Sequence, residues 1–486
     1  MLTTTVPKVL LGTLLLMLLC VVSGRPQVFS DTKAYYALGQ EVAGVFTTPD
    51  PVAHDVALRG RVMPKAEAAD QTRLAYTVAA SRSPYWSFAF YLLVAAGTAW
   101  LVVAVQALIA AGTLHAAMRA LEVEHAYLPV VAVLAVTSTL PLFVLFLMPD
   151  VFSGLAILAA AAVIARGRML SRGTLAGLTL LMAAAALVHT SHILLLAGIG
   201  ILSLTWALVR RRADMLRGAW LVLAAAAVGA VGGLAFPVTV QAVRGEPISA
   251  PPFLSARLIA DGPGRRVLMQ DCQGSVRWGW CRFTGQPLED VNQILWATDP
   301  AHRVFQAANY DLRTRIIAEQ PRFVLATLAR EPGAVVLAAL HNVVGLLGRY
   351  GSLEVLEDPT FRYRDPAFRV FGSIVPGTAA CVSGVASCAS RINIGVFDAV
   401  LGITLLAALV AIGWLLLRDA DLRRRWGVPL GVVGLGLLVN AAVCGTLSGD
   451  SERYQSRITW LIPAMAMMLI VSRRASRPAE NDVAHA

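Results

Sequence analysis

Long uninterrupted apolar stretches dominate the pattern of this 486-residue chain. Runs rich in Leu, Ala, Val and Gly recur with the length, about 17–25 residues, that an α-helix needs to cross a hydrocarbon core about 30 Å thick. They lack the alternation of transmembrane β-strands, so helices are the only spanning structure left. The pattern therefore predicts an all-α polytopic membrane protein of about ten transmembrane helices, over residues 9–22, 87–111, 128–148, 151–165, 174–189, 193–209, 220–238, 395–417, 428–447 and 458–471.

The polar segments between these runs predict the domain organisation. We expect an N-terminal transmembrane module over 1–240 with a first external loop at 24–86, and a large external loop region over 241–393 that contains short helices. C-terminal transmembrane helices follow at 394–472, and 473–486 form a cytoplasmic tail.

Two apolar segments have a second interpretation. Residues 334–347 are apolar but short and contain His341 and Asn342, so they predict an interfacial or re-entrant helix rather than a span. The first run, 9–22, could be a cleaved signal peptide; the poor cleavage site at 23–26 favours a retained helix.

The distribution of charge supports the membrane assignment. Charged residues make up only 15% of the chain, against about 25% in soluble proteins, while 57% are hydrophobic. The net charge of +11 lies in clusters between apolar runs, as expected of cytoplasmic loops and contacts with membrane lipids, and this pattern argues against nucleic-acid binding. We predict a multi-pass protein of the inner (plasma) membrane with both termini cytoplasmic. The clusters are Arg166, Arg168 and Arg172; Arg210, Arg211, Arg212 and Arg217; Arg418, Arg423, Arg424 and Arg425; and Arg473, Arg474 and Arg477.

The six cysteines fall into two groups. Cys20 and Cys444 lie in apolar runs and predict packing roles. Two close pairs in polar loops, without the neighbouring ligands of a zinc site, predict local disulfides in an oxidising external compartment. These pairs are Cys272 with Cys281 and Cys381 with Cys388.

Two carboxylates follow apolar runs at the expected outer surface. Asp31 comes shortly after the first helix and Asp150 lies in the short turn between the third and fourth spans. Each could cap the following helix. Together they could bind a divalent metal ion or divide general-base and positioning roles.

Two further polar groups stand at external helix ends. His189 and His192 could contact phosphate or form a polar cap, since zinc would need a third ligand. Arg453 and Arg457 are spaced to face the same way and grip a diphosphate, or they could pair internally with Asp450 and Glu452.

These motifs resemble the GT-C superfamily of polyprenyl-phosphate-sugar-dependent glycosyltransferases. The resemblance rests on Asp31 with the nearby Tyr35, on Asp150, and on the closing Glu452-Arg453-Tyr454 before the last helix. It implies a lipid-linked sugar donor, Asp31 as general base, and Asp150 assisting or binding Mg or Mn. It further implies that Arg453 and Arg457 hold the donor phosphate with help from His189 or His192, and it adds Tyr35 and Tyr454 to the substrate-binding residues.

Two other functions remain open. An export, flippase or polymerase component for lipid-linked polysaccharide would share the external arginines, and transport would also require ionisable residues in mid-span. A non-enzymatic membrane assembly protein could bind a partner through the Trp-rich loop around Cys272 and Cys281. The pair Asp31 and Asp150 favours the transferase.

Overall fold

The protein is helical throughout the part of the chain that its computed structural model describes. These residues are 2–47, 73–245, 247–275, 277–297, 299, 302–357, 372, 374–375, 378–379, 390–449 and 451–475. Within them, seven helices are long and apolar enough to cross a membrane, or eight if one bent pair counts as a span. This agrees with a multi-pass membrane protein.

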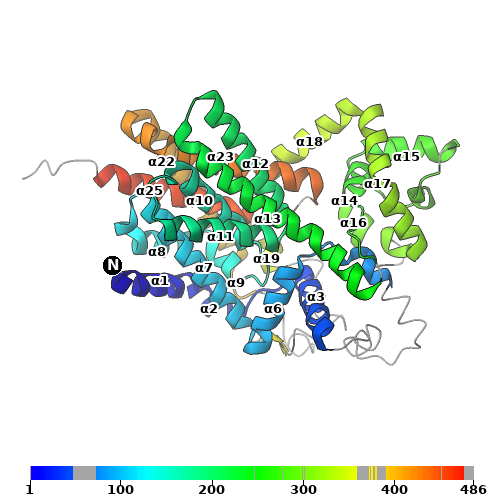
Figure 1. Ribbon diagram of the computed structural model, residues 1–486, viewed down its shortest axis with the longest axis horizontal. Coiled ribbons are helices and arrows are strands. Elements are labelled where there is room, and N and C mark those ends of the chain that lie inside the picture. Colours follow the sequence, from blue (N-terminus) through cyan, green and yellow to red (C-terminus); the bar gives the residue numbers. More distant parts are fainter. Residues whose placement is uncertain are drawn as a thin grey trace, which may run out of the picture.

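The long helices form a bundle with a single large hydrophobic core (Figure 1). Its central element is α10 (Val151–Arg166), in which every side chain from Val151 to Ile164 is buried, as expected of a helix that is apolar all round. The helices that carry the candidate spans are α1 (Leu2–Leu16), α2 (Leu18–Ser23), α7 (Ala99–Ala120), α12 (Thr190–Val209), α13 (Ala213–Arg244), α22 (Ile394–Arg418), α23 (Ala420–Leu447), α24 (Arg453–Thr459) and α25 (Leu461–Ala475).

Shorter apolar helices complete the bundle. The span expected at 87–111 is divided at Gly97, because Thr98 accepts a hydrogen bond from Trp100 N and starts a new helix there. The expected span at 128–148 is likewise two helices. The shorter elements are α6 (Pro84–Ala96), η1 (Glu124–Ala126), α8 (Tyr127–Thr137), α9 (Leu140–Leu145) and α11 (Arg172–Val188).

A second group of helices has its own hydrophobic core, in which Trp280, Phe305 and Phe323 are buried. This unit lies in the loop region that the sequence predicts to be external and is here called the external unit; Figure 1 shows it on the side of the molecule opposite the N-terminus of α1. It comprises α14 (Phe253–Ala260), α15 (Pro263–Gln273), η2 (Gly279–Phe283), α16 (Val291–Trp296), η3 (Phe305–Ala307) and α17 (Tyr310–Arg330).

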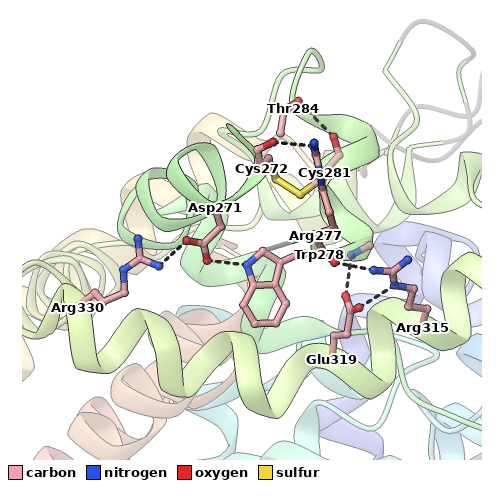
Figure 2. The surroundings of a disulfide bond; sticks show 10 residues. Asp271, Cys272, Arg277, Trp278, Cys281, Thr284, Arg315, Glu319 and Arg330 are labelled. Atoms are coloured by element: carbon pink, nitrogen blue, oxygen red, sulfur yellow. Dashed lines mark hydrogen bonds and ion pairs between the residues drawn. A yellow bond between two sulfur atoms is a disulfide. The ribbon is translucent and has the colours of Figure 1, made fainter. Parts of the chain in front are cut away.

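The expected disulfide between Cys272 and Cys281 is present in this unit (Figure 2). Next to it, Asp271 accepts hydrogen bonds from Trp278 Nε1 at 2.8 Å and from Arg330 Nη1 at 2.7 Å, which ties the disulfide loop to α17. Cys381 and Cys388, the other expected pair, lie outside the described residues.

The apolar segment expected near 334–347 is a helix, α18 (Pro332–Leu347). It is bent by 102° from α17, the geometry of a broken span or a re-entrant segment. Leu346 packs against α23, and Asn342 Nδ2 donates to Asp261 Oδ2 at 3.0 Å. A short helix, α19 (Leu353–Leu356), follows.

The described members of the arginine clusters gather at one end of the bundle, here called the arginine-rich end; Arg477 lies outside the described residues. Arg168 donates to Ala213 O at the start of α13, and Arg473 lies 3.9 Å from Asp419 between α22 and α23. Helix α10 and the pair α24–α25 start next to each other, because Asp150 at the start of α10 contacts Arg453 at the start of α24. Both α10 and α25 end in arginines. Asp150 therefore lies at the opposite end from the clusters.

Candidate functional site

The segment after α2 is held against the turn that precedes α10. Gln27 and Phe146 form an isolated parallel β-bridge: Gln27 N donates to Leu145 O at 3.0 Å, and Leu147 N donates to Gln27 O at 2.9 Å. Gln106 of α7 donates to Phe146 O at 2.9 Å and supports the same turn. This pairing brings the two loops that carry the candidate acids together.

Asp150 is at the N-cap position of α10, yet its side chain makes no capping hydrogen bond. Its carboxylate instead faces two guanidinium groups: Arg457 Nη1 lies 3.4 Å from Oδ1, and Arg453 Nη1 lies 3.5 Å from Oδ2. The side chain is 1% exposed. The arginines thus pair with this distant acid, while Asp450 lies outside the described residues.

Asp31 lies in the first turn of α3 (Ser30–Thr47) and is more open, with 29% of its side chain exposed. Its Oδ1 forms an ion pair with Arg82, and its Oδ2 lies 4.0 Å from Arg453 Nη2. Arg453 therefore lies between the two acids, and the site is one connected cluster.

Arg82 is a site residue that the sequence analysis missed. It precedes α6 and contacts two aromatic rings, with its Cζ 5.9 Å from the ring of Tyr35 and 5.4 Å from the ring of Trp296. The sequence did offer a signal: Arg82 is an arginine next to a helix start in a loop predicted to be external, the same departure from the charge rule that singled out Arg453. No comparable feature of the sequence singled out Trp296, which belongs to the external unit.

Tyr35 is buried in α3, a helix that packs against α6. Burial raises the pKa of its phenol above the ordinary value. The helices approach closely at Gly39, where a Cβ atom would lie 2.2 Å from Ser87 O. The expected helix after Asp31 is thus present.

The guanidinium groups of the site lie over aromatic rings, and some of their N–H groups have no hydrogen-bond acceptor in the described part of the chain. Arg453 Cζ lies 4.3 Å from the centroid of Phe29, and the ring of Tyr454 lies 5.0 Å from Arg453 Cζ and 5.3 Å from Arg457 Cζ. Among the described residues, the buried Nε atoms of Arg82, Arg453 and Arg457 have no hydrogen-bond partner. Buried donors of this kind favour an additional acceptor.

The histidines join the cluster through Ser191. Arg457 Nη2 donates to Asn440 Oδ1 at 2.9 Å and to Ser191 Oγ at 3.3 Å, and Ser191 Oγ lies 2.8 Å from His189 Nδ1. His189 also caps α12 by accepting from Ser191 N, so the polar-cap interpretation applies to it. His192 is buried, with Nδ1 2.8 Å from Ala185 O and Nε2 without a described partner.

The donor set suits an anion rather than a divalent cation. Three guanidinium groups surround two carboxylates, and each carboxylate faces at least one guanidinium. The described residues contain no group of three or more His, Cys, Asp or Glu side chains that could hold a metal ion. Oxygen ligands turned toward arginines do not fit Mg or Mn.

Comparison of the chain with known protein families, with characterised proteins and with solved structures finds no match. The site is a net positive, largely buried cluster with one more open carboxylate, that of Asp31, at its edge.

Proposed function

We propose that this protein is a membrane glycosyltransferase that moves a sugar from a polyprenyl-phosphate donor to an acceptor at the external, periplasmic face. The observation that carries the proposal is the convergence of Asp31, Arg82, Arg453, Asp150 and Arg457 at the end of the bundle opposite the arginine-rich end.

The three arginines would bind the phosphate of the donor. Their unpartnered Nε atoms and excess of positive charge favour an anion. During transfer, the acceptor oxygen bonds to the anomeric carbon as the bond from that carbon to the phosphate oxygen breaks. The arginines then stabilise the negative charge that develops on the departing polyprenyl phosphate.

The two acids would have different roles because they differ in exposure. Asp31, at the open edge, can reach an acceptor hydroxyl and take its proton as general base. Asp150, with both oxygens toward buried guanidinium groups, is a positioning residue that holds Arg453 and Arg457.

Trp296 would form one wall of the sugar site. Its ring stands over Arg82, which is paired with Asp31, and Phe253 packs beside it with ring centroids 6.0 Å apart. An aromatic face next to a few polar groups is a common lining for ligand sites, and the C–H face of a sugar ring can stack on it.

The test measures transfer or hydrolysis of radiolabelled polyprenyl-phosphate sugars by purified protein in nanodiscs. Asp31→Asn is expected to lower turnover about 10²–10⁴-fold, the usual contribution of a general base. Asp214→Asn, which removes an exposed acid paired with Arg212, is the matched control and should retain wild-type turnover. Chelation of divalent metal should leave the rate unchanged.

Two results would contradict the proposal. Turnover that survives in Asp31→Asn would remove the proposed base. Absence of turnover across a broad panel of donors, with the protein folded, would favour the export or binding functions.

A further inference from the structure

A cavity lies at the arginine-rich end, between α22 and α25 and far from the proposed active site. Its volume is about 280 Å³. It is lined by Ala411, Trp414, Leu415, Ile470, Arg473 and Arg474. The lining is thus apolar on one side and doubly cationic on the other.

The charges around this cavity are poorly balanced. Two guanidinium groups lie over the ring of Trp414, with Arg473 Cζ 4.9 Å and Arg418 Cζ 5.2 Å from its centroid. The ion pair of Arg473 with Asp419 is long, at 3.9 Å. Arg474 forms no ion pair with any described residue. Arg418, Arg473 and Arg474 thus contribute three positive charges and Asp419 contributes one negative charge. This excess of positive charge favours the binding of an anion.

The cavity continues into a surface that lipid chains would cover. Trp414 is 45% exposed, and α22 presents further large apolar side chains to the outside: Leu406, Leu409, Val410 and Leu417. A tryptophan beside arginines at the end of an apolar helix is typical of the headgroup level of a membrane. The polar head of a lipid at this position would meet the arginines, and its apolar tail would lie along α22.

We propose that this cavity is a binding site for one anionic phospholipid. Its phosphate lies between Arg473 and Arg474, its glycerol region packs on Trp414, and an acyl chain follows the exposed face of α22. Basic pockets between transmembrane helices bind anionic headgroups in this way. The site is independent of the proposed glycosyl transfer, because none of its residues belongs to that cluster.

The test measures the Kd of dioleoyl phosphatidylglycerol for the full chain in detergent, by native mass spectrometry. The double variant Arg473→Gln/Arg474→Gln is expected to weaken binding about 30-fold, which corresponds to ~1 kcal/mol for each arginine. Arg474→Gln alone should weaken it about fivefold without changing thermal unfolding, because its guanidinium pairs with no described acid.

The matched control is Arg210→Gln/Arg211→Gln, which removes two exposed charges from the same end away from the cavity. Its Kd should stay within about twofold of wild type, a shift below ~0.5 kcal/mol. Equal weakening of lipid binding in both double variants would show general electrostatic attraction of the lipid to the arginine-rich end, and it would overturn the proposed site. Equal binding of phosphatidylcholine would overturn the anion requirement. Binding of inorganic phosphate as tightly as the lipid would overturn the role of the acyl chain.

Discussion

Gln27 and Phe146 form a parallel β-bridge, and each is followed four residues later by one of the candidate acids, Asp31 and Asp150. The bridge aligns two loops that are far apart in sequence, so their acids arrive at the same end of the bundle. Arg453 then reaches both, at 4.0 Å from Asp31 and 3.5 Å from Asp150.

The buried pairing of Asp150 predicts a large loss of stability on neutralisation. Asp150→Asn removes the acid that faces the buried Arg457 and leaves the buried Arg453 only its 4.0 Å pair with Asp31, so it is expected to lower the free energy of unfolding by about 3–5 kcal/mol. Asp214→Asn breaks an exposed pair and should cost less than about 1 kcal/mol. Denaturant unfolding in detergent distinguishes them, and equal losses would contradict the buried pairing.

The close approach of α3 to α6 predicts intolerance of any side chain at Gly39. A Cβ there would meet the backbone oxygen of Ser87 at 2.2 Å, so Gly39→Ala is expected to cost about 1–3 kcal/mol. At Gly413 of α22 a Cβ would meet no atom within 4 Å. Gly413→Ala should therefore be neutral or stabilise by up to about 1 kcal/mol. Thermal unfolding of both variants checks this, and a tolerated Gly39→Ala would rule out the contact.

The disulfide predicts a redox-dependent stability of the external unit. Cys272 and Cys281 close a loop with a sequence separation of 9, so loss of the bond is expected to cost about 2–3 kcal/mol. Limited proteolysis with and without reductant measures this. Reductant should not change cleavage further in Cys272→Ser/Cys281→Ser; equal protection of oxidised and reduced wild type would contradict the prediction.

The partly buried carboxyl of Glu452 is expected to make the stability of the protein depend on pH. Burial raises the pKa of this carboxyl, and the neighbouring Glu354 and Asp398 carboxylates act in the same direction. A raised folded-state pKa means that the stabilising contribution is complete below the ordinary value of 4.5 and is lost as pH rises through the raised value. Thermal unfolding from pH 4 to 8 should show this decline, and Glu452→Gln should reduce it. An identical pH profile in the variant would contradict the assignment.

The predicted orientation of the chain in the membrane determines which residues can be labelled from outside the cell. We expect a cysteine at Gly285, in the external unit, to react with a membrane-impermeant maleimide in intact cells. A cysteine at Arg211, in the arginine-rich end, should react only after permeabilisation. Wild-type protein measures the background from its own cysteines. Reversed labelling would invert the proposed topology.

The sequence alone determined the helical character and the broad layout of the chain, because these depend on local signals. An apolar run must satisfy its own backbone hydrogen bonds in lipid, so its length and composition are enough to predict a helix. The helices from α10 to α13 lie where the apolar pattern places them, and the Cys272–Cys281 bond follows from proximity in a polar loop. The same pattern did not reveal the break at Gly97, where a cap at Thr98 interrupts an apolar run.

Only the tertiary structure decided how the polar residues of the site are paired and exposed. The sequence singled out Asp31, Asp150, Arg453 and Arg457, but their partners lie up to hundreds of residues away: Asp150 and Arg457 are 307 positions apart. Burial and ion pairing depend on which distant segments pack together, and a local pattern carries no record of this. For the same reason Arg82 and Trp296 belong to the site only through tertiary contacts, in which Arg82 pairs with Asp31 of α3 and lies over the ring of Trp296.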